Sequence, residues 1–187
     1  ATEYFYRFIV KSGEFEGATS PVGRALTAPE ADASVDNLNL AIASCANWES
    51  GFFAAYGDMA QRARGGEIDH VVFLGDYIYE YPTGEYAGKS GVARMHHPEW
   101  EITTLEDYRQ RHGRYRTDLN LQAAHAACPW IVIWDDHESA NNSWFEGAEN
   151  HTDGRVEGEW PERLSACLLY RSDAADEEDS VGLGGGR

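Results

Sequence analysis

Three short apolar segments of this sequence each end at residues whose side chains bind metal ions in many proteins. The residues with this potential, in chain order, are Cys45, Asp76, Tyr79, Asp136 and His137. Together they offer a thiol, two carboxylates, a phenol and an imidazole, which are ligands for transition metals and for harder cations. The chemistry that they indicate is a centre of one or more metal ions.

Buried strands are expected to position these residues. The segments 38–43, 69–74 and 130–134 are short and apolar, as is typical of strands covered on both faces. Ligands of open parallel sheets bind beyond the carboxyl ends of the strands, so the three ends should meet at one edge. The pair Gly75-Asp76 alone is equally typical of an ordinary turn, and the repetition of the pattern is what favours a site.

Helices are predicted between these strands. Residues 52–64 have apolar side chains spaced for one helical face. Thr103 and Glu106 fit a capping box that opens a helix ending at Tyr115. A further helix is predicted over residues 119–127. Helices that connect neighbouring strands imply parallel pairs with right-handed crossovers, so the predicted fold class is α/β with parallel β-α-β units.

The N-terminal part is predicted to be a separate unit. Residues 2–10 are aromatic and β-branched and favour a strand, and residues 11–17 favour a turn. Residues 20–29 contain two prolines and a glycine and are predicted to be a connector. We expect residues 1–30 to be the last strand of an otherwise missing β-domain, with the connector that follows it.

Residues 81–100 are predicted to be a long loop, and a long loop in a compact domain is usually functional or mobile. Its adjacent histidines, His96 and His97, are expected to face solvent, with metal binding as the less favoured alternative. Two further residues, His125 and Cys128, lie in apolar, alanine-rich surroundings and are expected to serve packing.

The composition is that of a globular protein with a strongly acidic surface. The 187 residues carry a formal net charge of −17 without a cluster of Lys and Arg, which argues against a nucleic-acid partner. No segment reaches the length of a membrane span, and the three cysteines show no familiar spacing. An acidic protein needs local positive charge to hold an anionic substrate, and metal ions would supply it.

Several motifs, taken in order, resemble the alkaline phosphatase D (PhoD) family of metallophosphoesterases. The resemblance covers roughly residues 4–145. The matching segments are Phe5-Tyr6-Arg7-Phe8, Val22-Gly23-Arg24, Ala43-Ser44-Cys45, His70 to Glu80, Thr104 to Arg109, Leu121 to Ala126, and Trp134 to Glu138 followed by Asn141-Asn142. A single motif of this set is weak, whereas the combination is highly specific.

The resemblance implies hydrolysis of phosphate monoesters and diesters at a centre of Fe3+ and Ca2+. Cys45, Asp76 and Tyr79 match iron ligands of the family, and the carboxylate at position 76 would bridge to the second cation. Asp136 stands where the superfamily usually has a metal-binding Asn. His137 matches the histidine that faces the phosphate, where it would stabilise phosphoryl oxygens or protonate the leaving group. Asp76 and His137 are therefore the expected catalytic residues.

Part of the family pattern is absent. The family completes its centre with a Gly-Asp-x-His segment and further histidines, whereas only His151 follows His137 here. Residues 31–166 are therefore expected to be a partial metallophosphatase domain. Because residues 167–177 resemble the translation of a sequencing-library adapter, residues 167–187 are expected to be a disordered, non-native tail. A natural acidic tail is the alternative.

Three hypotheses are open for this chain. The first is a phosphatase or phosphodiesterase, secreted or periplasmic and monomeric in its full-length form, that acts on a small phosphoester. The chain as given would then be an incomplete fragment with little or no activity, because a metal that lacks half its ligands is weakly held. The second is a metal- or phosphate-binding module without catalysis. The third is an incompletely folded piece whose exposed sheet edge associates nonspecifically.

Overall fold

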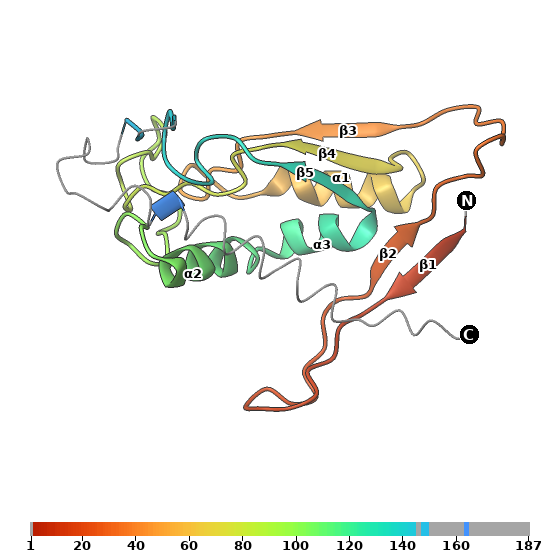
Figure 1. Ribbon diagram of the computed structural model, residues 1–187, viewed down its shortest axis with the longest axis horizontal. Coiled ribbons are helices and arrows are strands. Elements are labelled where there is room, and N and C mark those ends of the chain that lie inside the picture. Colours follow the sequence, from red (N-terminus) through yellow and green to blue (C-terminus); the bar gives the residue numbers. More distant parts are fainter. Residues whose placement is uncertain (1, 145–146, 150–162, 165–187) are drawn as a thin grey trace.

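Three parallel strands form the central sheet (Figure 1). The structure is a computed structural model that describes residues 2–144, 147–149 and 163–164, so the predicted tail at 167–187 lies outside it. The strands, in chain order, are β3 (Leu40–Ala43), β4 (His70–Leu74) and β5 (Trp130–Ile133). Strand β4 lies between the other two. The three predicted parallel strands and the α/β class are confirmed.

The register of the sheet brings the carboxyl ends of the strands to one edge. Ala43 of β3 pairs with Phe73 of β4, and Leu74 of β4 pairs with Ile133 of β5. Immediately beyond this edge the chain that follows β4 lies against the chain that follows β5. The segments that carry the candidate ligands therefore start side by side.

Three helices connect the strands. Their bounds are α1 (Ala54–Arg64), α2 (Leu105–Tyr115) and α3 (Leu119–Ala127). Helices α1 and α3 pack side by side on one face of the sheet (Figure 1). Within the described part of the chain, none of the helices is both long enough and apolar enough to cross a membrane.

The core lies between the sheet and these helices, and both predicted packing residues contribute to it. Val71 and Phe73 of β4 are fully buried on the helical side. The ring of His125 stacks on Trp130 with the ring centroids 3.9 Å apart. Cys128 is also fully buried. The packing role predicted for His125 and Cys128 agrees with these contacts.

The start of α2 differs from the prediction by one residue. The N-cap is Thr104, whose hydroxyl accepts a hydrogen bond from the backbone N of Asp107 at 3.2 Å. The Asp107 carboxylate accepts reciprocally from the backbone N of Thr104 at 3.0 Å and also from that of Thr103 at 3.3 Å. The predicted box of Thr103 with Glu106 was wrong, because the Glu106 side chain instead accepts from Gln110 one turn later.

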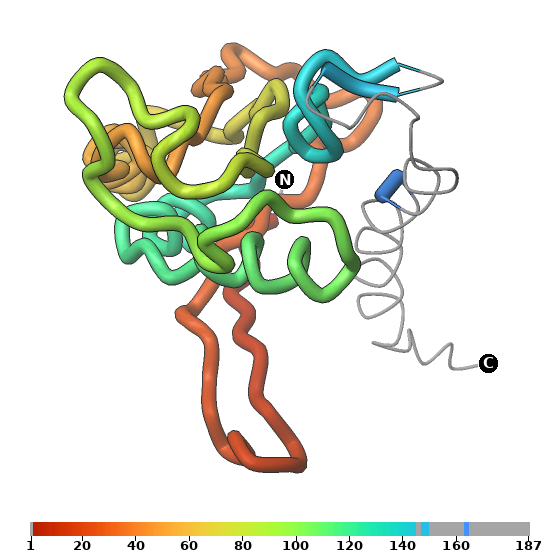
Figure 2. The backbone as a smooth tube through the Cα atoms, turned by 90° about the vertical axis from the view of Figure 1, so that its left-hand side faces the viewer, coloured from red at the N-terminus to blue at the C-terminus, as the bar shows by residue number. Residues whose placement is uncertain are grey.

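A separate antiparallel pair precedes the sheet. Strand β1 (Glu3–Tyr6) pairs with β2 (Gly23–Leu26), and the hairpin between them projects from the rest of the molecule (Figure 2). The predicted connector over 20–29 was wrong in part, since residues 23–26 form a strand. Prolines stand only on either side of these four residues, so their backbone N–H groups are free to pair. Whether residues 1–30 belong to a β-domain stays a prediction.

The long loop at 81–100 lacks helix and strand, as predicted, but buried groups hold it. His96 is 2% exposed, and its Nε2 lies 3.1 Å from Oε1 of Glu49, so the expectation of a solvent-facing side chain was wrong for this residue. His97 is exposed as expected. Burial, together with the nearby positive charge of Arg111, lowers the pKa of His96 to about 3. His96 is therefore neutral at physiological pH.

Candidate metal centre

The turn after β4 places the candidate ligand Asp76. The backbone is left-handed at both Gly75, with φ of 94°, and Asp76, with φ of 55°. The Glu138 carboxylate fixes this turn, because it accepts hydrogen bonds from the backbone N of Asp76 at 3.1 Å and from that of Tyr77. It also accepts from the backbone N of Asp135 at 2.6 Å. One buried carboxylate thus ties the end of β4 to the end of β5.

Two other predicted ligands contact Asp76. Its Oδ2 accepts hydrogen bonds from the Cys45 thiol at 3.4 Å and from the Tyr79 hydroxyl at 3.2 Å. Cys45 reaches this position because its backbone is also left-handed, with φ of 59°, and its N donates to the carbonyl of Gly75 at 3.1 Å. The second carboxylate oxygen of Asp76, Oδ1, is buried and has no hydrogen-bond partner among the described residues.

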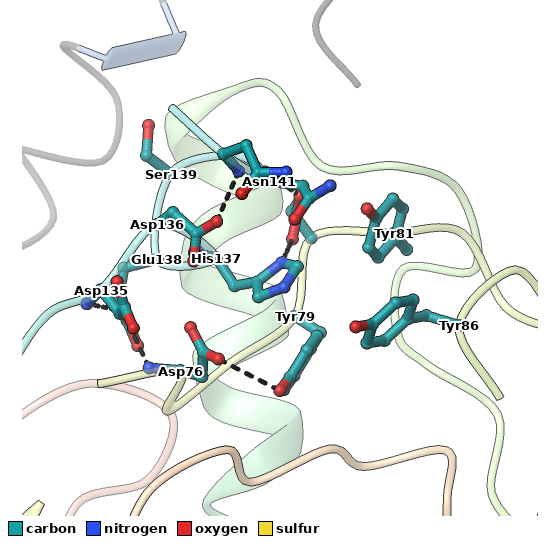
Figure 3. Close-up of polar contacts among 12 residues, drawn as sticks. Asp76, Tyr79, Tyr81, Tyr86, Asp135, Asp136, His137, Glu138, Ser139 and Asn141 are labelled. Atoms are coloured by element: carbon teal, nitrogen blue, oxygen red, sulfur yellow. Dashed lines mark hydrogen bonds and ion pairs between the residues drawn. The ribbon is translucent and has the colours of Figure 1, made fainter. Parts of the chain in front are cut away.

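The segment after β5 brings Asp136 and His137 to the same place (Figure 3). One ligand atom from each of Asp76, Asp136 and His137 lies within 4.8 Å of the other two. The Asp136 carboxylate accepts hydrogen bonds from the backbone N of His137 at 3.1 Å and from that of Asn142. Backbone donors therefore hold the Asp136 carboxylate close to Asp76 and to His137.

Glu80 fixes the orientation of the His137 ring. Its Oε2 lies 2.8 Å from His137 Nδ1, while its Oε1 accepts from the backbone N of Asn141 at 2.6 Å. Burial acts to lower the pKa of His137, but the contact with Glu80 and the charges of Asp76 and Asp136 outweigh it and raise the pKa. A ring held at Nδ1 in this way presents its other nitrogen for chemistry.

The electrostatics of the site fit a bound cation. Burial raises the pKa of Asp76, and the nearby carboxylates of Asp136 and Asp135 raise it further against the opposing effects of His137 and Cys45. Burial, followed by the charge of Asp76, likewise raises the pKa of Tyr79. A cation would relieve this crowding of negative charge and would be bound by Oδ1 of Asp76, which accepts no hydrogen bond from the described residues. The oxygen, nitrogen and sulfur donors present suit a transition metal beside a harder cation.

The structure brings all five predicted residues into one cluster, whose roles stay predictions. Reasoning from the sequence missed the parts played by Glu80 and Glu138, which hold His137 and the turn after β4. The sequence signal for them was that each glutamate is the last residue of a motif in which an apolar segment is followed by acidic residues. His96 and His97 are not members of the cluster. His151 lies outside the described residues.

Three comparisons with known proteins, by family model, by sequence and by structure, agree with one another. Residues 40–169 match the model of a family described as PhoD-like phosphatase. The chain is 50% identical to alkaline phosphatase D of Bacillus subtilis (strain 168) over 139 residues, which are 74% of this chain and 22% of that protein. A solved structure described as "Structure of PhoD" matches with a TM-score of 0.78 and 42% identity, over 91% of this chain and 30% of that one.

These matches show how much of its relatives' length the chain covers. It spans about a fifth of the length of the curated relative, and less than a third of the solved chain. The high TM-score confirms the expected fold class, a partial metallophosphoesterase-like sheet.

Proposed function

Because the chain belongs to the PhoD-like phosphatase family, we propose that its cluster of five residues helps to form a metal centre that hydrolyses phosphate monoesters or diesters. The observation that carries this proposal is the convergence of Asp76, Asp136 and His137, whose ligand atoms lie within 4.8 Å of one another. We further propose Fe3+ and Ca2+ as the cations, a small phosphoester as the substrate, and a secreted or periplasmic location for the full-length protein.

Each residue would have a distinct role. When bound, the cations would neutralise charge on the phosphate and lower the pKa of the attacking water. Asp76 would hold cations through its buried Oδ1, to which none of the described residues donates a hydrogen bond. The Cys45 thiol and the Tyr79 hydroxyl donate hydrogen bonds to Oδ2 of Asp76, and both groups would lose their protons on binding iron. Asp136 would complete the set of protein ligands in this part of the centre.

His137 would act on the substrate rather than on the metals. Glu80 holds its Nδ1 at 2.8 Å and favours the protonated ring. The free nitrogen of a protonated imidazole would donate a hydrogen bond to a phosphoryl oxygen, or a proton to the leaving oxygen. Glu80 is thus a positioning residue for His137.

A non-catalytic module that binds metal or phosphate is the second candidate function. It is favoured by the fact that the chain covers only 22% of its curated relative, so further ligands present in that protein can be missing from this chain. A centre with few protein ligands still binds a cation, but it holds the cation less firmly and in a less defined geometry.

The test combines metal content with turnover. The purified chain is supplied with Fe3+ and Ca2+, and bound metal and hydrolysis of a chromogenic phosphodiester are measured for the wild type, Asp76→Ala and Asp58→Ala. Asp58 is the matched control, since it pairs with Arg62 on the exposed surface of α1. We expect Asp76→Ala to lower the affinity for metal by about a hundredfold or more and to abolish the weak turnover of the wild type, because it removes a metal ligand. The control should change neither.

Two results would decide against the proposal. Stoichiometric metal binding without turnover by the wild type would favour the binding module. Turnover that survives Asp76→Ala at the wild-type rate would show that the hydrolysis comes from another site or from a contaminant.

A further inference from the structure

Three tyrosine rings lie in a stack beside the candidate centre (Figure 3). Tyr86 stacks on Tyr79 with ring centroids 5.3 Å apart and on Tyr81 at 5.0 Å, with interplanar angles of 23° and 22°. The ring of Tyr86 also lies 5.5 Å from that of His137. In Figure 3, His137 lies between the acidic residues and this stack. A group attached to a phosphate held at His137 would therefore reach Tyr86 within the length of one ring.

Tyr86 is the exposed member of the stack. It is 47% exposed, whereas Tyr79 is 4% exposed and Tyr81 is 7% exposed. Contact between an exposed aromatic ring and water is unfavourable. Binding sites often use such a ring to pack against a ligand. The two buried tyrosines contact the ring of Tyr86, and close to half of the surface of Tyr86 stays exposed beside them.

Tyr86 is also held in place before any ligand binds. Its carbonyl accepts a hydrogen bond at 3.0 Å from the side chain of Asn47, two residues after the candidate ligand Cys45. The same loop is fixed on one side of Tyr86 by Gly84, whose N donates to the buried Glu49 carboxylate at 2.8 Å. A fixed ring loses little conformational entropy when a ligand stacks on it.

We propose that Tyr86 stacks against a planar aromatic group esterified to the phosphate, so that aryl phosphoesters are the substrate class this site prefers. The inference rests on the proposed function, because it places the phosphate at His137. A flat aromatic group gains from stacking on a phenol ring, whereas a puckered or polar aliphatic group of the same size gains much less. The net charge of −17 adds a bias against leaving groups that carry further negative charge.

The test uses two phosphonates that cannot be hydrolysed. Phenylphosphonate and cyclohexylphosphonate have rings of similar size, but only the first ring is flat. Their dissociation constants are measured by titration calorimetry with the protein supplied with Fe3+ and Ca2+. We expect phenylphosphonate to bind about fivefold more tightly to the wild type, which is the usual size of an aromatic stacking preference.

Variants then assign that preference to one ring. Tyr86→Phe keeps the ring and should keep the preference, while Tyr86→Ala should reduce the ratio of the two constants to about one. Trp144→Ala is the control, since Trp144 is 54% exposed and lines a cavity that borders Asp136 but not Tyr86. The control should leave the ratio unchanged.

Three outcomes would overturn the stacking proposal. They are equal affinity of the wild type for the two phosphonates, no binding of either, and a preference that persists in Tyr86→Ala. Hydrolysis is measured separately on the same preparation with the chromogenic diester. A ratio that falls in Tyr86→Ala without any turnover would uphold the stacking site and reject the proposed catalysis, so the two failures are distinguishable.

Discussion

Two predicted metal ligands adopt the left-handed backbone conformation at the candidate centre, as does Asn142 (φ of 49°), whose backbone N donates to the Asp136 carboxylate. Cys45 and Asp76 have φ of 59° and 55°, which costs each of them about 1 kcal/mol or more. The hydrogen bonds to Glu138 and to the Gly75 carbonyl hold the backbone in this form. As a result, the Cys45 thiol, which follows β3, contacts Oδ2 of Asp76, which follows β4. The strain therefore lies where the chemistry would be.

Gly75 makes this meeting possible, and its substitution gives a direct test. A Cβ at Gly75 would lie 2.5 Å from both Cβ and backbone N of Asp135, in a backbone conformation with φ of 94°. We expect Gly75→Ala to lower the free energy of unfolding by about 2 kcal/mol or more, because both the clash and the conformation oppose it. Urea unfolding followed by circular dichroism measures the change.

Gly113 supplies the matched control for Gly75. It is exposed and lies two residues before the end of α2, and a Cβ there would meet no described atom within 4 Å. Gly113→Ala should raise the free energy of unfolding by about 0.5 to 1 kcal/mol, because alanine favours the helix. If both substitutions had the same effect, the close approach of the two strand ends would be refuted.

Among the elements, the loop at 81–100 depends on one buried side chain of α2. Arg111 is fully buried, and its guanidinium donates to the carbonyls of Tyr79, Tyr81, Pro98 and Trp100. These carbonyls lie at the two ends of the loop, so one residue closes it. The sequence signalled a long loop, but not this closure, because backbone carbonyls leave no pattern in the side chains.

Arg111→Lys should therefore open the loop. Lysine keeps the charge but cannot donate to several carbonyls in fixed directions, and unpaired buried carbonyls would remain. We expect a loss of about 2 to 4 kcal/mol in the stability of the loop. Hydrogen exchange should show faster exchange at Thr83 and Ile102, whose amides bond across it, than in α1. Equal acceleration in both regions would mean global destabilisation and would contradict a local closure.

The capping box of α2 gives a second test at this scale. Thr104→Ala should cost about 1 kcal/mol in the free energy of unfolding, because it leaves the backbone N of Asp107 without its cap. Thr103→Ala, one residue earlier, removes no hydroxyl from the observed box and should cost only a few tenths. Thermal unfolding of both variants measures the difference. A larger effect at Thr103 would restore the box that the sequence predicts.

The contrast between these features shows what sequence patterns can predict. The strands β3, β4 and β5 follow from short apolar runs, and the rule that parallel strands end at one edge predicts that Asp76 and Asp136 approach each other. Strand β2 has no such run, because its four residues, Gly-Arg-Ala-Leu, pair in a separate two-stranded ribbon. The roles of Glu80 and Glu138 also escaped prediction, because both act on backbone donors that are distant in sequence.

At the scale of the whole molecule, the described residues cover the sheet on one side only. Helices α1 and α3 pack on one face (Figure 1), while apolar residues of the opposite face are exposed. These residues, with their exposed fractions, are Leu40 (46%), Ile42 (68%), Leu74 (44%), Ile131 (55%) and Ile133 (48%). Parallel sheets in proteins are normally covered on both faces, and contiguous exposed apolar surface promotes association. This face is expected to dominate the behaviour of the isolated chain in solution.

We therefore predict that the isolated chain associates as its concentration rises, although the full-length form is expected to be a monomer. The double substitution Ile42→Glu and Ile131→Glu places charge on the bare face and should keep the chain monomeric. Phe52→Glu is the matched control, because Phe52 is 74% exposed but lies on the segment before α1, away from the sheet. It should associate as the wild type does. Light scattering coupled to size-exclusion chromatography measures the mass, and a wild-type chain that stays monomeric up to millimolar concentration would show that this face does not drive association.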